Sequence, residues 1–218
     1  MKFIYIFLIG MFFSFKTHSQ VLNVVYEMSS FGGELKNIEK LYVYEDKSRY
    51  VSNLKAQTKV GKLRNNQDVD FNIPARHRII DFYFADKQIK EYALYRKNVF
   101  KAEWISDIEW VITQETGEYL GYNVTKAYFE NEKGMRTYAW FTTQIPVSVG
   151  PLRYNGLPGL ILLIEHDKIN TVIRATEINK DTEYTFENID TEKTILISRK
   201  DILEHNEDFF RKKIKEAK

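Results

Sequence analysis

Apolar and polar residues alternate along most of the chain in short runs, and turn-forming residues separate these runs. A period of two residues is typical of β-strands that bury one face. Aromatic residues make up 15% of the chain, and Tyr and Phe favour such half-buried strands. The pattern predicts strands over residues 21–28, 41–44, 48–52, 79–84, 89–95, 99–104, 110–114, 118–129, 135–142 and 171–178. Residues 160–165 predict a further strand that is almost wholly apolar, as expected when both faces of a strand are covered.

Short polar segments are expected to form the turns of antiparallel hairpins at residues 45–47, 115–117, 131–134 and 167–168. Gly117 and Gly134 lie in two of these turns, where a positive φ favours glycine. The pair Gly32–Gly33 marks a break after the first strand. The polar segment 53–76 predicts a long loop or a weakly paired edge strand.

The last part of the chain changes to a helical period. Apolar residues recur on one face of the expected helix, namely Ile202, Leu203, Phe209, Phe210 and Ile214. Ser198 precedes them as a helix cap, with Asp201 at the third helical position. Together with the strands, this predicts a mainly β (α+β) fold, a curved antiparallel sheet or half-barrel with a C-terminal helix packed on it.

Residues 1–19 have the features of a signal peptide. Lys2 gives a basic start, residues 3–15 form an apolar run, and residues 17–19 offer a cleavage site with small residues. The apolar run is shorter than the roughly 20 residues that a membrane-spanning helix needs, so cleavage is favoured over a retained anchor. We therefore expect residues 20–218 to form a single periplasmic or secreted domain with no integral membrane span.

Charge and cysteine content exclude several classes of protein. The formal net charge is +2, and loss of Lys2 and Lys16 with the signal peptide reduces it to 0. A balanced chain has no bulk attraction for nucleic acid or for anionic membranes. The chain has no cysteine, which excludes disulfides, thiol chemistry and lipid attachment at a lipobox cysteine.

A group of short motifs lies between residues 109 and 167. Its centre is the hexapeptide Gly156–Leu157–Pro158–Gly159–Leu160–Ile161, and around it lie Trp110, Gly121–Tyr122, Lys126–Ala127, Ala139–Trp140, Ile145–Pro146 and Gly150–Pro151. In this order the motifs resemble the GLPGLI family, exported proteins of one Gram-negative lineage that have no characterised activity. The chain departs from that family at Val124, where many relatives carry cysteine.

The resemblance to the GLPGLI family implies a place in the cell envelope. Genes of that family often lie beside genes for outer-membrane receptors, so a receptor of this kind is one expected partner. The strand pattern also looks like the half-barrel of outer-membrane lipoprotein carriers, but an analogy of fold implies little about function.

The hexapeptide supports two interpretations. Pro158 fixes its own φ and makes Leu157 extended, while the flanking glycines allow dihedral angles that other residues avoid. In the first interpretation, the motif is a backbone corner that starts the strand 160–165. In the second, residues 145–159 form a shaped loop at the mouth of a cavity and display side chains to a ligand. The candidate binding residues are Trp140, Arg153, Tyr154 and Asn155.

No arrangement of residues in the sequence points to catalysis or to a cofactor. His77, His166 and His205 lack the spacing of metal ligands. The acidic residues near two tryptophans, Glu103, Asp107 and Glu109, leave open an envelope hydrolase. We expect non-enzymatic binding of an apolar small molecule or of an outer-membrane protein. An envelope hydrolase and a purely structural or assembly role are the alternatives.

Overall fold

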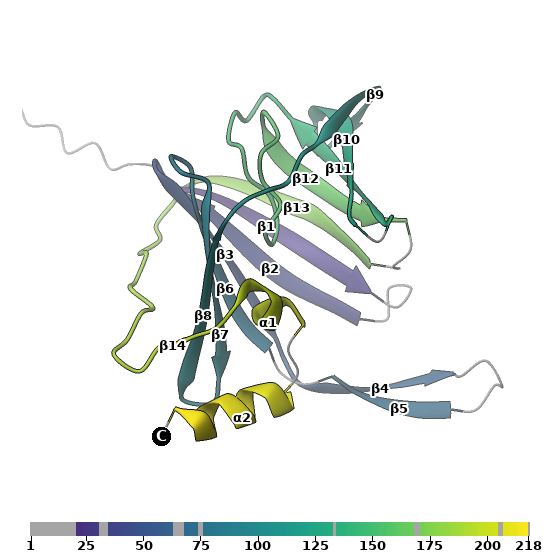
Figure 1. Ribbon diagram of the computed structural model, residues 1–218. Helices are drawn as coiled ribbons and strands as arrows, with labels where there is room; N and C mark the ends of the chain where they lie inside the picture. Colours follow the sequence, from purple (N-terminus) through teal and green to yellow (C-terminus); the bar gives the residue numbers. More distant parts are fainter. Residues whose placement is uncertain are drawn as a thin grey trace, which may run out of the picture.

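The computed structural model describes residues 21–30, 35–62, 68–73, 76–132, 134–167, 171–204 and 207–217. Figure 1 shows one large sheet, a separate hairpin that projects from it, and two helices near the C-terminus. The expected signal peptide and the Gly32–Gly33 break lie outside the described residues. Within these ranges, no helix is long and apolar enough to cross a membrane.

The large sheet is open and mostly antiparallel. Its strands are β1 (Val21–Ser30), β2 (Leu35–Val43), β3 (Lys47–Leu54), β6 (Arg76–Tyr83), β7 (Gln88–Tyr95), β8 (Asn98–Ile105), β9 (Val111–Tyr119), β10 (Tyr122–Glu130), β11 (Arg136–Thr142), β12 (Leu160–His166), β13 (Thr171–Thr182) and β14 (Ile195–Leu196). The 12 strands are ordered β14-β8-β7-β6-β3-β2-β1-β13-β12-β11-β10-β9. Among the strands of the described ranges, only β14 pairs in parallel, with β8. The mainly β fold is therefore confirmed.

Alternate residues of the strands form an inner and an outer face. On the inner face, the register aligns Val24, Leu41, Tyr50, Ile80 and Glu91 across β1, β2, β3, β6 and β7. Four of these five are apolar or aromatic and belong to the main core. Farther along the sheet, the inner face carries small and aliphatic residues, Ala127, Ala139, Ile164 and Ile173. The apolar residues of this face form one main core, and a second cluster lies where the C-terminal segment packs on β7 and β8.

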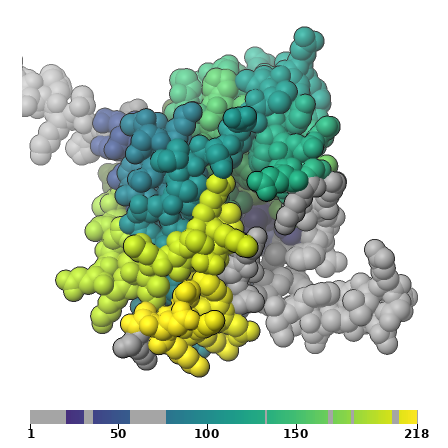
Figure 2. Space-filling model, viewed as in Figure 1, coloured from purple at the N-terminus to yellow at the C-terminus, as the bar shows by residue number. Residues whose placement is uncertain are grey.

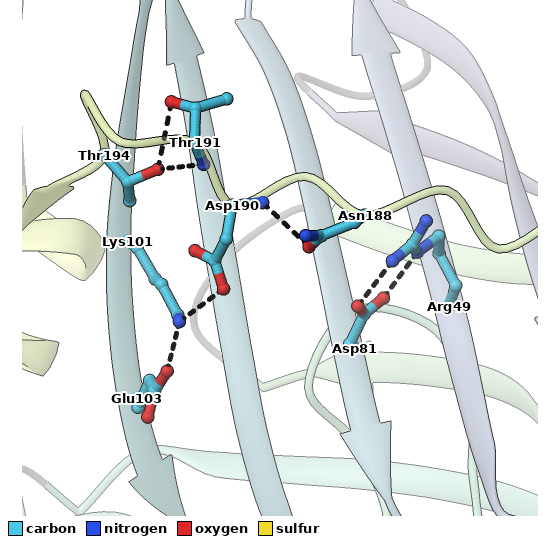
Figure 3. Close-up of polar contacts among 8 residues, drawn as sticks. All are labelled: Arg49, Asp81, Lys101, Glu103, Asn188, Asp190, Thr191 and Thr194. Atoms are coloured by element: carbon cyan, nitrogen blue, oxygen red, sulfur yellow. Dashed lines mark hydrogen bonds and ion pairs between the residues drawn. The ribbon is translucent and has the colours of Figure 1, made fainter.

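Residues 183–194, which we call the strap, lead from β13 to β14 across the outer face of β2, β3, β6, β7 and β8 (Figure 1). Tyr184 in the strap stacks on Tyr42, with ring centroids 3.6 Å apart. Farther along, the Lys101 ammonium donates to Asp190 at 2.7 Å, as Figure 3 shows. The strap therefore covers part of the outer face with an aromatic and an ionic contact.

A buried ion pair lies beneath the strap (Figure 3). The Arg49 guanidinium donates two hydrogen bonds of 2.6 Å to the carboxylate of Asp81 on the neighbouring strand. A further guanidinium N–H donates to the carbonyl oxygen of Glu187 in the strap at 2.8 Å. Because such bidentate pairs have fixed geometry, Arg49 links β3, β6 and the strap at one point.

Two helices, α1 (Arg199–Glu204) and α2 (Glu207–Glu216), replace the single helix expected from the sequence. Both lie against β7 and β8 on the inner face. Figure 2 shows the atoms of the C-terminal segment in yellow next to teal atoms of the sheet. Phe210 packs on Phe100 with ring centroids 4.3 Å apart, next to Ile202. The Ser198 hydroxyl accepts the N–H of Asp201 at 3.0 Å, so the predicted cap is confirmed.

Two other predictions need correction. The segment 53–76, expected as a long loop or a weakly paired edge strand, contains two strands, β4 (Gln57–Lys62) and β5 (Asp68–Ile73), which pair with each other outside the large sheet. The turn after β9 lies at Leu120–Gly121, where both residues have positive φ, of 50° and 77°. Gly117 instead pairs with Val124 inside the ladder. A glycine in a strand gave the same local signal as a glycine in a turn.

Candidate functional site

An open groove of about 530 Å³ lies between the ends of β1, β2 and β6 and the segment 143–159, which we call the β11–β12 loop. Its apolar wall is formed by Leu22, Val43, Phe82, Phe84, Pro146 and Val147. Its polar lining includes Glu45, Lys87 and Ser148. This volume lies within the range of roughly 300–1,000 Å³ that is typical of small-molecule sites.

The sequence pointed to one wall of this groove and missed the other. The β11–β12 loop was a candidate because of its motif. Phe82, Phe84, Glu45 and Lys87 gave no signal, because they lie at strand ends and in turns that resemble others in the chain. Their common location follows only from the pairing of β2, β3 and β6.

The β11–β12 loop is held in shape by its own backbone. Val149 and Asn155 form an antiparallel bridge, and the Gly156 N–H donates to the Ser148 carbonyl oxygen at 3.2 Å. The Ile161 N–H donates to the carbonyl oxygen of Val149 at 3.0 Å. These bonds fix the loop against the start of β12, so the wall of the groove is preformed.

The hexapeptide forms a sharp corner that leads into β12. Gly156 has a φ of +95°, a region that residues with a Cβ rarely adopt. Gly159 does not have a positive φ, but a Cβ there would overlap the backbone carbonyl of Thr142. Leu157 and Leu160 are 1% and 0% exposed, respectively. Gly156 is therefore required for its dihedral angle, and Gly159 for the close approach of two backbones.

Arg153 ties the β11–β12 loop to the inner face of the sheet. Its guanidinium donates two hydrogen bonds, of 2.5 and 2.6 Å, to the carboxylate of Glu91 on β7. The same carboxylate lies 2.9 Å from the guanidinium of Arg78 and is 0% exposed. Contrary to expectation, Arg153 is only partly exposed, at 23% of its side chain, and compensates a buried charge.

A second polar cluster lies deeper on the inner face. The carboxylate of Glu39 accepts hydrogen bonds from the hydroxyl groups of Tyr50 and Ser52 and from the amide of Asn37. Burial, and then the neighbouring Glu39, raise the pKa of Tyr50 well above its usual value. Among the described residues, no buried side-chain polar atom lacks a hydrogen-bond partner. This cluster is thus satisfied within the chain.

Tyr154 and Asn155 also face inward. The Trp110 indole N–H donates to the carbonyl oxygen of Asn155 at 2.7 Å, and Trp110 meets Phe129 edge to face at 5.0 Å. The Tyr154 hydroxyl lies 3.4 Å from Nε2 of His166. Burial lowers the pKa of His166 and raises that of Tyr154. Asn155 is 3% exposed but lines the groove; a role of these residues in binding stays a prediction.

Trp140 is not part of the same site. In the sheet it is paired with Lys126 and Leu163. Its side chain lies on the outer face, whereas that of the preceding residue, Ala139, lies on the inner face. The Lys126 ammonium lies 5.3 Å from the centre of its ring. The structure therefore brings together three of the four candidate residues, Arg153, Tyr154 and Asn155, and separates Trp140 from them.

The acidic residues considered for a hydrolase do not converge. Glu103 lies on the outer face and binds Lys101 at 2.5 Å. Asp107 accepts two hydrogen bonds from Arg199, of 2.7 and 2.9 Å, and Arg199 lowers its pKa. Glu109 is exposed. His205 lies outside the described residues, and within them no group of three metal-binding side chains could hold an ion.

One family model matches part of the chain, over a range that includes the β11–β12 loop. The model of a family described as a protein of unknown function (Porph_ging) matches residues 82–163. This range includes β7 to β11 and the hexapeptide, which lies in the β11–β12 loop and the start of β12. No curated protein matches the chain.

Among solved structures, the chain is similar to PNGF-II in two crystal forms. The structure in space group P21 is 20% identical with a TM-score of 0.60, and the match covers 91% of this chain and 34% of PNGF-II. The structure in space group C2 is 19% identical with a TM-score of 0.58, and covers 91% and 33%. The chain thus spans about a third of the length of PNGF-II, and at this identity the likeness shows the fold alone.

Proposed function

We propose that this protein is an exported, non-enzymatic binding protein that holds an apolar ligand in the groove beside the β11–β12 loop. The apolar wall of the groove is the observation that carries this function. Six apolar side chains from three strand ends and the loop surround a volume of about 530 Å³. A preformed apolar groove gains affinity because little ordering is needed on binding.

Export, a half-barrel shape and a place in the GLPGLI family are part of the proposed function. The apolar segment 3–15 supports export, and the hexapeptide, together with the family match over residues 82–163, supports the family. N-terminal sequencing of protein recovered from the periplasm or medium should give Gln20 or Val21 as the first residue. A retained Met1 in the membrane fraction would contradict export.

A series of straight-chain alcohols tests the binding function. We expect displacement of a neutral fluorescent probe, with affinity rising about three- to fourfold for each added methylene until the groove is filled. That increment reflects the transfer of each methylene from water. Failure of the probe and of every alcohol to bind at micromolar concentration would refute an apolar site.

A pair of variants ties the binding to the groove. Val147→Trp places a large ring in the groove and should abolish binding of the longer alcohols. Val111→Trp, on the exposed strand β9, adds the same ring far from the groove and should leave binding unchanged. Equal binding by both variants would place the ligand elsewhere. Circular dichroism checks that both are folded.

An outer-membrane receptor remains a predicted partner. This prediction is based on the resemblance to the GLPGLI family. The geometry of the groove gives no argument for or against such a receptor. Crosslinking in whole cells, followed by the same experiment with Val147→Trp, would show whether a receptor contacts the groove or another surface.

A further inference from the structure

The rim of the groove carries one exposed cation and one exposed anion. Lys87 lies in the turn between β6 and β7, and Glu45 in the turn between β2 and β3. The two turns are neighbours, because the Phe84 N–H donates to the carbonyl oxygen of Asp46 at 3.0 Å. Neither charged side chain forms an ion pair with any residue that the structure describes.

Lys87 occupies an unfavourable backbone position. Its φ is +56°, where glycine or asparagine would be less strained. Arg96 has the same φ in the next turn but does not line the groove. A lysine at this position therefore gives the rim a cation at some conformational cost, and Arg96 is a natural control for that cost.

We infer that the ligand is a free single-chain amphiphile with a zwitterionic head group. This inference rests on the proposed binding of an apolar chain in the groove. An anionic head group is attracted by Lys87 and repelled by Glu45. A cationic head group is attracted by Glu45 and repelled by Lys87. A head group with both charges pairs with both residues. Because both side chains are exposed to water, the preference is modest, about three- to tenfold.

Titration calorimetry with chain-matched dodecyl compounds tests the inference. The probes are dodecylphosphocholine, dodecyl phosphate and dodecyltrimethylammonium, each below its micelle-forming concentration. We expect the first to bind about three- to tenfold more tightly than the other two. Equal binding of all three would overturn the head-group assignment while leaving the apolar site intact. Binding of none would overturn the apolar site itself.

Charge reversals then assign the preference to the two residues. Lys87→Glu should move the preference to dodecyltrimethylammonium, and Glu45→Lys should move it to dodecyl phosphate. The controls are Lys97→Glu and Glu132→Lys, exposed positions that do not line the groove. Lys87→Asn and Arg96→Asn should both relieve backbone strain, but only the first should weaken the preference for dodecylphosphocholine.

Two outcomes of these variants would overturn the inference. One is an unchanged preference in both reversals. The other is an equal change in the controls, since this would reflect net charge and not the rim. Co-sedimentation of the protein with phosphatidylcholine vesicles would mean that the protein binds a membrane surface and not a free amphiphile. We expect the protein to stay in the supernatant.

Discussion

The large sheet contains two groups of strands that are covered differently, a first group of β1 to β3 and β6 to β8 and a second group of β9 to β12, with β13 between them. The strap crosses the outer face of the first group, while the helices and Arg153 of the β11–β12 loop contact its inner face. In the second group, the outer face carries half-buried Trp140, and Val111 and Ile112 at the edge are 50% and 51% exposed. Covering on two faces permits the buried charges of the first group, such as Glu91. In the second group, consecutive residues of β12 are buried, whereas the edge strand β9 is mostly exposed.

The two groups meet at a short seam. Strands β12 and β13 are paired only from Leu163 to Glu165 within the described residues. Where the strands part, the hydroxyl of Tyr26 donates to the carbonyl oxygen of Ile161 at 2.7 Å. The hydroxyl of Tyr119 donates to the carbonyl oxygen of Ala175 at 2.8 Å. Side chains thus replace the missing ladder bonds, and the core remains continuous across the seam.

Gly159→Ala should have the largest effect on this arrangement. Its Cβ would overlap the backbone of Thr142, which cannot move aside like a side chain. We expect the free energy of unfolding to fall by about 4 kcal/mol or more in chemical denaturation. Gly117→Ala, where the nearest atom lies 3.6 Å away, is the control and should be neutral or stabilising. Loss of structure in β9 to β12 alone would show that the seam separates two folding units.

Leu160→Ala and Ile112→Ala compare the stability contributed by the interior of the second group with that contributed by its edge. Leu160 is 0% exposed, so truncation should cost about 2–5 kcal/mol through lost burial and a cavity. Ile112→Ala on β9 should change stability by less than about 0.5 kcal/mol, because the side chain is half in solvent. Urea titrations of both variants give the comparison. Similar costs would mean that the edge is buried in solution, as in an oligomer.

Arg153→Ala compares the buried ion pair of Glu91 on β7 with the exposed ion pair of Glu27 on β1. Its removal leaves the buried Glu91 with Arg78 and should cost about 2 kcal/mol. Arg174→Ala removes an exposed partner of Glu27 and should cost less than about 1 kcal/mol. A double-mutant cycle of Arg153→Ala with Glu91→Gln should show coupling. An Arg153→Ala variant as stable as the parent would mean that the β11–β12 loop is not held by this pair.

His166 should give the smallest effect, a dependence on pH. Burial lowers its pKa, so the folded state disfavours the charged imidazole. This contribution to stability is complete above the unfolded pKa of about 6.5 and is lost as the pH falls toward the lower folded pKa. The slope cannot exceed about 1.4 kcal/mol per pH unit. Denaturation of the parent and of His166→Gln between pH 7 and 5 should differ by this slope, and parallel curves would contradict it.

Much of the secondary structure could be predicted from sequence because its causes are local. The apolar run of residues 160–165 and the cap at Ser198 are signals within a few residues, and both agree with the structure. The strands predicted over residues 79–84 and 89–95 agree as well, with β6 and β7. Where local signals were ambiguous, prediction failed: Gly117 resembled a turn, and the polar strands β4 and β5 resembled a loop.

The candidate site was predicted only in part. The motif indicated the β11–β12 loop, but the orientation of its side chains depends on the sheet beneath it. Arg153 meets Glu91 across 62 positions in the chain, and no local pattern encodes that contact. Trp140 shares the motif region, yet its strand position places it on the outer face.

The sequence by itself determined that this chain forms mostly strands with one apolar face, a capped helical end and a rigid corner before β12. The tertiary structure decided which turns flank the groove, which charges are buried and which face the strap covers. The physical reason is the range of the interactions. Dihedral preferences and hydrophobic periods act between neighbours, whereas a groove and its rim arise only when distant turns are brought together by strand pairing.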